Sequence, residues 1–294
     1  MQTKQQIQQL LAAAGVSPNK RLGQNFFIDM NLLGLLLKNA AINHSDIVLE
    51  IGTGTGTLTE ELIKTAGIVV CVEYDSTMAK ITASRVRDAE NFKLFNVDAL
   101  ESKNTLNHDV IAELKEAKNK FSGRVMLVAN LPYNVASPVM VNLLSGQIIA
   151  DTMVVTVQKE VSQRMSAEPG SEDYGILSIV MSAMGRVKII RNLSPKVFWP
   201  QPKVSSSIVR FDRDIEKANR ILDVKLFKEV INLFMGHRRK MMKACVKFAE
   251  NDLARVHNWH DIFDRAFIEP HHRPEELTPD DYVAMANLCH ESLY

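Results

Sequence analysis

The stretch Ile47-Val-Leu-Glu-Ile-Gly-Thr-Gly-Thr-Gly56 carries the clearest indication of the fold. Residues 47–51 are a short β-branched apolar run that stops at Gly52, which is typical of a buried strand. Residues 57–66 then place apolar side chains at helical spacing, with Gly67 just beyond them. A buried strand that leads through a glycine turn into a helix is the first unit of a parallel α/β sheet.

The same alternation continues towards the C-terminus. Predicted strands cover 68–72, 93–97, 125–129 and 153–157, and predicted helices lie near 77–86, 111–117, 138–144 and 175–183. This spacing predicts a doubly wound, mainly parallel sheet with helices on both faces. Residues 187–191 and 205–211 are also strand-like, and the proline-rich loop between them contains no helix. We therefore expect seven strands, the last two forming an antiparallel terminal pair.

The β pattern ends near residue 214. Residues 226–235, 239–249 and 280–288 are amphipathic and helical in pattern. We therefore predict two domains: an α/β domain with an N-terminal extension over 1–215, and a small α-helical domain over 216–294.

The composition excludes several classes of protein. The 294 residues include 35 Lys and Arg against 34 Asp and Glu, an ordinary globular mixture with a net charge of +1. Cys71, Cys245 and Cys289 have no paired spacing, which excludes a disulfide framework and a cysteine zinc site. No signal pattern is visible at the N-terminus, and the apolar stretch 32–37 is too short to span a bilayer. We expect a cytoplasmic monomer without a metal or a membrane partner.

The glycine turn and two acidic residues indicate a cofactor. Glycines let the backbone approach a ligand closely, but the turn alone is a weak signal, and a structural tight turn is the alternative. Its Gly-x-Gly-x-Gly spacing disfavours a nicotinamide dinucleotide. Glu73 ends the second strand, 21 residues after Gly52, and Asp98 ends the third. Acids at these positions suit ribose hydroxyls and an adenine amino group, so we predict a nucleoside-containing cofactor across the strand ends.

The fourth strand ends in the tetrapeptide Asn130-Leu131-Pro132-Tyr133. Pro132 restricts the residue before it to an extended conformation, which leaves backbone carbonyls to point outward beside the Asn130 amide oxygen. Such acceptors suit both hydrogens of an exocyclic amine, whose lone pair they would direct at an electrophilic methyl group. Tyr133 is placed to stack on the base. The alternative is a turn with a packed tyrosine.

Five motifs together resemble one family. They are Arg21-Leu-Gly-Gln-Asn-Phe-Phe27, Glu50-Ile-Gly-Thr-Gly-Thr-Gly56, Asn130-Leu-Pro-Tyr133, Gln158-Lys-Glu160 and Phe198-Trp-Pro-Gln-Pro-Lys-Val204. They occur in the order seen in the KsgA family of small-subunit ribosomal RNA dimethyladenosine transferases, and the match runs from about Lys20 to Leu288. The resemblance implies a class I, Rossmann-like fold that uses S-adenosylmethionine and releases S-adenosylhomocysteine. It implies N6-dimethylation of two adjacent adenosines in the 3′-terminal hairpin of 16S rRNA, in an immature 30S particle, during ribosome biogenesis.

The resemblance also implies roles for single residues. The target adenine would be flipped out and stacked near Tyr133 and Phe198, because its amine cannot be reached inside a base-paired stack. A hydrophobic loop anchor is the alternative for Phe198. The catalytic residues would be Asn130, Leu131, Pro132 and Tyr133, and the cofactor would be held by Asn25, Phe27, Gly52, Gly54, Glu73, Asp98 and Asn130.

The chain departs from the family pattern at three places. Thr53 stands where the family usually has proline, and Ser205 where it has an acid. The segment around 101–124 is longer than expected, and we predict an extra surface helix there.

Basic residues cluster after Gly236. The cluster consists of Arg238, Arg239, Lys240, Lys243 and Lys247. On a helix, Arg239, Lys243 and Lys247 would form one stripe. A solvated helix face is the usual explanation, but beside a base-modifying site the cluster predicts contacts with the RNA backbone, to which Lys20 and Arg21 would contribute.

The near-zero net charge does not exclude an RNA partner, because charge is segregated along the chain. Residues 215–247 carry +6, whereas residues 248–294 carry −7. Two alternatives remain: an Erm-type 23S rRNA dimethylase, and a non-catalytic RNA-binding assembly factor. Segment 273–277 and the basic cluster favour the small-subunit branch, and intact Glu73, Asp98 and Asn130 argue for activity.

Overall fold

The structure is a computed structural model that describes residues 2–19, 22–102 and 105–294. Contacts divide it into two compact units. The first comprises the chain up to Ser162 together with Lys188–Asp212, and the second comprises Gln163–Val187 and Arg213–Tyr294.

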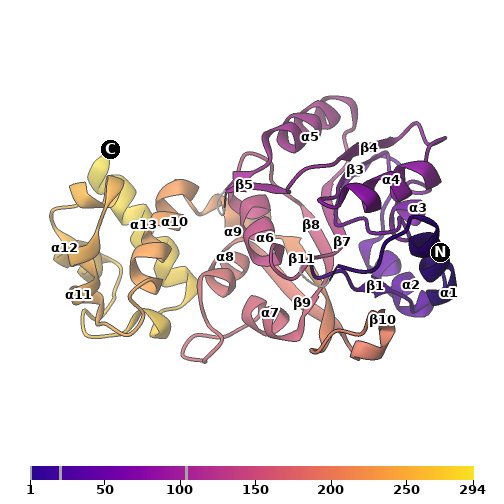
Figure 1. The fold of residues 1–294 in the computed structure, drawn as a ribbon. Helices are drawn as coiled ribbons and strands as arrows, with labels where there is room; N and C mark the ends of the chain where they lie inside the picture. The colour runs from indigo at the N-terminus through magenta and orange to yellow at the C-terminus, as the bar shows by residue number, and fades with distance from the viewer. Residues whose placement is uncertain (1, 20–21, 103–104) are drawn as a thin grey trace. The chain divides into compact units, whose positions relative to one another are not determined.

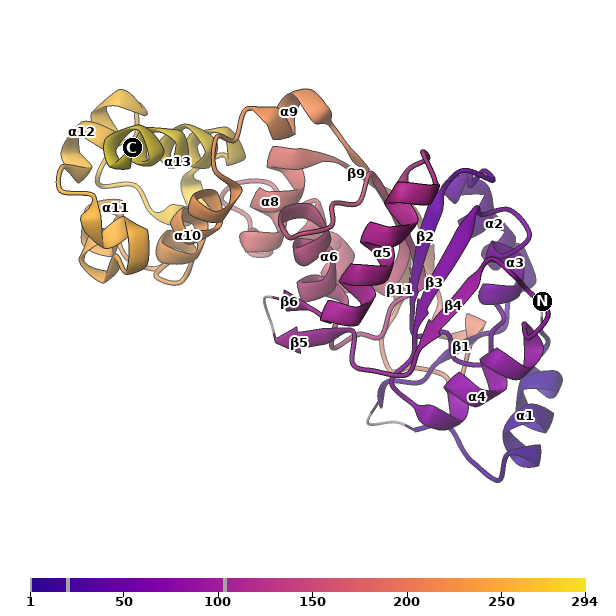
Figure 2. The same ribbon diagram turned by 90° about the horizontal axis from the view of Figure 1, so that it is seen from above.

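A seven-stranded sheet forms the centre of the first unit, in the order β4-β3-β2-β7-β8-β11-β9 (Figures 1 and 2). Strands β4, β3, β2, β7 and β8 are parallel, and β11 runs antiparallel to β8. The doubly wound, mainly parallel sheet of seven strands is therefore confirmed. Its strands are β2 (Ile47–Ile51), β3 (Ile68–Val72), β4 (Phe92–Phe95), β7 (Val125–Asn130), β8 (Thr152–Gln158), β9 (Gly185–Leu193) and β11 (Ser206–Arg213).

The strand order creates a switch point between β2 and β7. From β2 the chain adds β3 and β4 on one side, and then β7 and β8 on the other. In parallel α/β sheets, ligands bind beyond the carboxyl ends of the strands at such a point. The segments that follow β2, β3, β4 and β7 therefore converge at one edge of the sheet.

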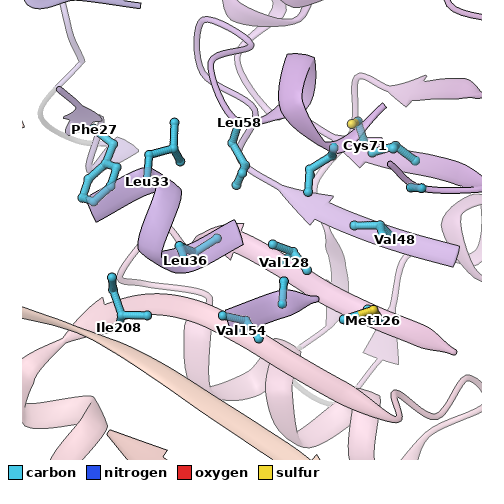
Figure 3. Close-up of a cluster of buried hydrophobic side chains, with 14 of the residues drawn as sticks. Phe27, Leu33, Leu36, Val48, Leu58, Cys71, Met126, Val128, Val154 and Ile208 are labelled. Carbon is cyan, nitrogen blue, oxygen red and sulfur yellow. The ribbon is translucent and has the colours of Figure 1, made fainter. Parts of the chain in front are cut away.

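Helices cover both faces of this sheet. On one face, Leu33 and Leu36 of α2 pack in a buried cluster with Val48, Val128 and Val154 of three strands (Figure 3). Helix α5 lies on the opposite face (Figure 2). The helices of the first unit are α1 (Lys4–Ala13), α2 (Met30–Ala40), α3 (Thr59–Leu62), α4 (Ser76–Arg85), α5 (His108–Lys120) and α6 (Ala136–Ser145), and α7 (Lys159–Met165) crosses the boundary between the units.

Two short strand pairs lie outside the main sheet. β1 (Phe26–Phe27) pairs antiparallel with β10 (Phe198–Trp199), which follows the 3₁₀ turn η2 (Pro195–Val197). β5 (Leu100–Ser102) pairs with β6 (Thr105–Leu106) just before α5. The described part of 101–124 thus contains this pair and α5. The expectation of an extra helix was wrong, because a strand pair takes up the additional length.

The second unit is helical in its part after residue 213, as predicted for 216–294. Helix α8, which the sequence analysis assigned to the first domain, packs here against α10 and α13, and the Tyr174 hydroxyl donates to the Leu277 carbonyl (2.8 Å). Segment 163–187 therefore groups with the C-terminal helices. The elements are α8 (Ile176–Met184), α9 (Ile215–Asn219), α10 (Val224–Met235), α11 (Met242–Cys245), η3 (Val246–Phe248), η4 (Asn251–Arg255), α12 (Trp259–Arg265), η5 (Pro274–Glu276) and α13 (Pro279–Leu293).

The predicted helix over 239–249 is not continuous. Only α11 and the 3₁₀ turn η3 are helical in this range. The N–H groups of Met242 and Lys243 donate to the carbonyls of His272 (2.9 Å) and Pro270 (3.1 Å) instead of to the preceding turn. Because Arg239 precedes α11, no single helix presents Arg239, Lys243 and Lys247 as one stripe.

Candidate active site

A cavity of about 340 Å³ lies at the switch point of the sheet, within the first unit. This volume is in the range of small-molecule sites. Its walls come from segments 22–27, 50–58, 72–74, 97–99 and 130–135. The cavity thus brings together the segments that the sequence analysis connected with a cofactor. The predicted residues that line it are Asn25, Phe27, Gly52, Gly54, Glu73, Asp98, Asn130, Leu131, Pro132 and Tyr133.

The glycine turn follows β2 and touches the tetrapeptide. Gly52 has a φ of +79°, a conformation that side-chain-bearing residues rarely adopt. A Cβ atom on Gly52 would lie 3.0 Å from Cγ of Pro132. Glycine is therefore required here both for the turn and for the close approach of Pro132.

The two predicted acids lie on adjacent strand ends. Glu73 is 8% exposed, and its Oε2 and Oε1 accept hydrogen bonds from the N–H groups of Gly54 and Asp75 (2.9 Å each). Burial raises the pKa of Glu73, and these backbone bonds oppose the rise. Asp98 is exposed, and its Oδ1 accepts from the Leu100 N–H (2.9 Å). Asn96 links the strand ends by donating to the Glu73 carbonyl (2.7 Å).

A third carboxyl, Glu50, also reaches the cavity wall from β2. It is buried, and its Oε2 accepts from the Thr59 hydroxyl (2.7 Å) and the Cys71 thiol (3.4 Å). Burial raises the pKa of Glu50 to about 8, and the Thr59 bond opposes the rise. Glu50 is therefore largely protonated at neutral pH.

The tetrapeptide presents two acceptors to the cavity. Asn130 donates through Nδ2 to the Asn25 carbonyl (3.0 Å), and the Leu131 N–H donates to the Thr156 carbonyl (3.1 Å). Oδ1 of Asn130 and the Leu131 carbonyl accept no hydrogen bond from residues 2–19, 22–102 or 105–294. Both residues line the cavity, and their role as an acceptor pair for an amine stays a prediction.

Tyr133 is anchored from the antiparallel part of the sheet. Its hydroxyl and Oγ of Ser206, at the start of β11, lie 3.0 Å apart. Burial raises the pKa of the Tyr133 phenol, so it stays neutral under ordinary conditions. This bond holds the tyrosine in the cavity wall.

Phe198 does not line the cavity. Its side chain is 3% exposed and packs on Phe27, with ring centroids 5.1 Å apart. The register of β1 and β10 pairs these two residues directly. The expected stacking of Phe198 on the target base is therefore corrected: in this structure Phe198 is the hydrophobic anchor that the alternative described.

Several cavity residues were missed by the sequence analysis, among them Gln24, Tyr74 and Thr156. Gln24 donates to Oδ2 of Asp75 (3.0 Å), and Tyr74 is 63% exposed. Thr156 is 1% exposed, and its hydroxyl has no hydrogen-bond partner in the described part of the chain. An aromatic residue directly after the strand-end acid Glu73, and a hydroxyl within an apolar strand, are signals that could have identified Tyr74 and Thr156.

One of the two substitutions relative to the family pattern has a structural account. Thr53 is buried, and its hydroxyl accepts from the Thr82 hydroxyl of α4 (3.1 Å), which ties the turn to that helix. The Ser205 carbonyl accepts from the Lys159 N–H (2.9 Å), but nothing in the structure explains its side chain.

The basic cluster lies in the second unit, and its members differ. Arg238 forms an ion pair with Glu275 (2.8 Å). Lys243 Nζ is 2.8 Å from Nε2 of His271, and Lys240 Nζ is 5.5 Å from the Phe248 ring centroid. The other two, Arg239 and Lys247, are exposed and have no partner among the described residues. Lys20 and Arg21 lie outside the described residues.

Neither a metal-ligand cluster nor a membrane-spanning helix occurs in the described ranges. No three His, Cys, Asp or Glu side chains gather there as metal ligands. No helix there has the length and apolar character needed to cross a bilayer.

The cavity fits S-adenosylmethionine. A turn with three glycines, two acids on neighbouring strand ends and an acceptor pair in the same cavity match the nucleoside and the reactive end of that cofactor. Together with the doubly wound sheet, these features define a class I S-adenosylmethionine-dependent methyltransferase. The chain belongs to the ribosomal RNA adenine dimethylase family, whose model matches residues 15–290. It is therefore an enzyme that dimethylates adenine in ribosomal RNA with S-adenosylmethionine as the methyl donor.

Curated relatives agree with this family. The chain is 36% identical to "Ribosomal RNA small subunit methyltransferase A" of Clostridium botulinum (strain ATCC 19397 / Type A) over 275 residues, which cover 94% of this chain and 95% of the relative. It is 35% identical to the protein of the same name from Caldanaerobacter subterraneus subsp. tengcongensis, over 92% of this chain and 97% of the relative.

Solved structures support the fold. A dimethyladenosine transferase from Plasmodium falciparum matches with a TM-score of 0.69 at 23% identity, over 91% of this chain and 98% of the other. The 23S rRNA methyltransferase ErmE matches with a TM-score of 0.59 at 19% identity, over 92% of this chain and 99% of the other.

Proposed function

We propose that this enzyme methylates the N6 amines of two adjacent adenosines in the 3′-terminal hairpin of small-subunit (16S) rRNA, during ribosome biogenesis. The observation that carries the proposal is the acceptor pair: Oδ1 of Asn130 and the Leu131 carbonyl, in the same cavity as Glu73 and Asp98. The names of the curated relatives support the small subunit as the source of the RNA.

The proposed cofactor contacts follow the cavity wall. Glu73 accepts hydrogen bonds from the ribose hydroxyls, and Asp98 accepts from the adenine amine. The glycine turn at Gly52 and Gly54 leaves room for the cofactor, and Asn25 and Phe27 contribute another part of the wall. When bound, S-adenosylmethionine supplies a methyl group on a positively charged sulfur.

The tetrapeptide orients the nucleophile. An adenine amine is a weak nucleophile because its lone pair is delocalised into the ring. Asn130 and Leu131 accept its two hydrogens, which favours localising that lone pair and directs it at the methyl carbon. The Tyr133 ring, held by Ser206, stacks on the flipped base and offsets part of the cost of unstacking.

Labelled cofactor and under-methylated small subunits test this reaction. We expect label in N6-dimethyladenosine of the small-subunit RNA. Asn130→Ala is expected to lower transfer by about 10²-fold or more, because an acceptor is lost at the reacting amine. Binding of S-adenosylhomocysteine, measured in parallel, reports whether the variant cavity is intact. Undiminished transfer by Asn130→Ala would contradict the proposed role of Asn130.

The same assay, run with under-methylated small and large subunits side by side, separates the two alternatives. Label in large-subunit RNA alone would favour the Erm-type reaction. The fold is similar to that of the 23S rRNA methyltransferase ErmE. No transfer to either RNA, with particle binding retained, would favour the non-catalytic assembly factor.

Two cationic surfaces support RNA as the partner. In the second unit we propose backbone contacts by Arg239, Lys240, Lys243 and Lys247; Arg238 is engaged with Glu275 and serves the fold. In the first unit, residues 188–211 include no Asp or Glu. Four cations of this stretch are exposed and form no ion pair with a described residue: Lys188, Arg191, Lys196 and Lys203.

We further propose that the enzyme is a cytoplasmic monomer that acts on immature 30S particles. Cys71, Cys245 and Cys289 are buried free thiols, which fits a reducing compartment. Analytical ultracentrifugation tests the monomer. Comparing transfer to immature and to mature under-methylated particles tests the preferred substrate.

A further inference from the structure

The N-terminal segment reaches the glycine turn through a buried side chain. Gln2 donates through Nε2 to the Thr55 carbonyl (2.8 Å), and its Oε1 accepts from the Thr55 hydroxyl (2.8 Å). The Gln2 side chain is 1% exposed, although glutamine is mostly exposed in proteins. Both ends of its amide are thus satisfied by one residue of the turn, 53 positions away in the sequence.

Helix α1 makes a second link to the same turn. The helix begins at a capping box between Thr3 and Gln6, and its Ile7 and Leu11 are buried with Phe26 and Met78. The Phe26 ring lies directly against the glycine turn, since a Cβ atom on Gly54 would be 3.1 Å from Cε1 of Phe26. Packing of α1 therefore holds the Phe26 ring in place against Gly54.

The turn needs such support because it is built from glycines. Gly54 and Gly56, on either side of Thr55, have φ angles of +56° and +79°. Glycine adopts many backbone conformations, so ordering the turn for a ligand costs more entropy than ordering other residues. From α4, the Thr82 hydroxyl donates to the Gly54 carbonyl (3.1 Å). Gln2 and Phe26 restrain the turn from other parts of the chain.

We propose that residues 2–13 form an N-terminal strap that holds the glycine turn in its cofactor-binding conformation, with Gln2 as a positioning residue. Gln2 does not line the cavity; it acts through Thr55, which does. Strap docking and cofactor binding are therefore coupled. The docked strap favours the ordered turn, and a bound cofactor stabilises the docked strap by the same factor.

Cofactor affinity tests the coupling. The dissociation constant of S-adenosylhomocysteine is measured by calorimetry, well below the unfolding temperature. Gln2→Ala removes both hydrogen bonds, and Gln2→Glu keeps the acceptor but places a carboxylate against the Thr55 carbonyl. We expect both to weaken binding about tenfold, as for the loss of buried hydrogen bonds. The KM for S-adenosylmethionine should rise by the same factor, while kcat changes less than about twofold.

Gln8→Ala is the matched control, because Gln8 is an exposed residue of α1 in the same strap and the substitution is chemically the same. It should leave affinity and KM unchanged. Thr55→Val removes the hydroxyl and keeps the carbonyl. Its effect on affinity should be less than additive with that of Gln2→Ala, since both break one interaction.

The result is different if the strap stabilises the fold without affecting cofactor binding. In that case Gln2→Ala lowers the unfolding temperature and leaves the dissociation constant within about twofold of the wild-type value, which would overturn the proposal. Hydrogen exchange adds an independent readout. With S-adenosylhomocysteine bound, amides of α1 should exchange more slowly in the wild type, and Gln2→Ala should reduce this protection. Equal exchange with and without ligand in the wild type would also contradict the coupling.

Discussion

At the residue scale, the hydroxyl of Thr156 is a buried polar group without a partner among the described residues, in the wall of the cavity. An unsatisfied hydroxyl costs about 1–3 kcal/mol in the ligand-free protein. We predict that Thr156→Val, which keeps the shape, raises the free energy of unfolding by about 1 kcal/mol and lowers methyl transfer. Chemical denaturation and kcat/KM measure the two effects.

Thr152 provides the control for this prediction. It is buried in the same strand, but its hydroxyl donates to Oδ1 of Asp212 (3.2 Å). Thr152→Val should therefore destabilise the protein and leave transfer nearly unchanged. If the two variants lose stability equally, the Thr156 hydroxyl is satisfied in the free protein and is not reserved for a ligand.

Glu50 makes stability depend on pH. Its pKa is about 8 in the fold, because of burial, against 4.5 in the unfolded chain. Its contribution to stability is therefore fully present below pH 4.5 and is lost as the pH rises through about 8, at about 1.4 kcal/mol per pH unit between these values. Glu50→Gln should remove this loss, so that the variant gains stability over the wild type from pH 5 to pH 9.

Denaturant titrations at several pH values check the Glu50 prediction. Glu116→Gln, an exposed change on α5, is the control and should show no such trend. A stability difference between Glu50→Gln and the wild type that is independent of pH would mean that the Glu50 carboxyl already ionises in the fold near its ordinary pKa.

At the scale of elements, the β1–β10 pair supports the cofactor segment 22–27. Phe198 packs on Phe27 and is buried, so Phe198→Ala should lower the free energy of unfolding by about 3–5 kcal/mol. It should also raise the KM for S-adenosylmethionine, because Phe27 loses its support. Phe198→Leu fills more of the space and should restore most of both. A normal unfolding temperature combined with a defect in RNA methylation alone would instead restore the base-stacking role.

Local patterns predicted the central strands well. The predicted bounds of β2 and β3 are the observed ones, because a strand buried on both faces is a continuous apolar run. Phe198 was different, since its place depends on pairing with Phe27, far away in the sequence. The helix over 239–249 failed for a similar reason: the carbonyls of Pro270 and His272 take the N–H groups that would have continued it. By contrast, the capping box of Thr3 and Gln6 at the start of α1 is recognisable in the sequence, but the sequence analysis did not use it to predict this helix.

At the scale of the whole molecule, charge is segregated rather than absent. Residues 215–247 contain nine Lys and Arg against three Asp and Glu, whereas residues 248–294 contain three against ten. Many cations of the second unit are neutralised within the fold: Lys225 pairs with Asp252, and Arg265 with Glu291. Arg239 and Lys247 are exposed without such a partner among the described residues. Cations already paired release fewer RNA counterions on binding, so RNA affinity should depend on the unpaired ones.

This distinction predicts the salt dependence of binding to small subunits. One variant replaces Arg239, Lys243 and Lys247 with glutamine, and a matched variant replaces the carboxylate-paired Lys225, Arg255 and Arg265. Both lower the formal net charge of +1 by three units. Each lost phosphate contact reduces the slope of log K against log salt by about 0.7–0.9, so the first variant should lose about two in slope and the second less than one. Equal slopes would mean that total charge, and not its position, governs the affinity of this enzyme for RNA.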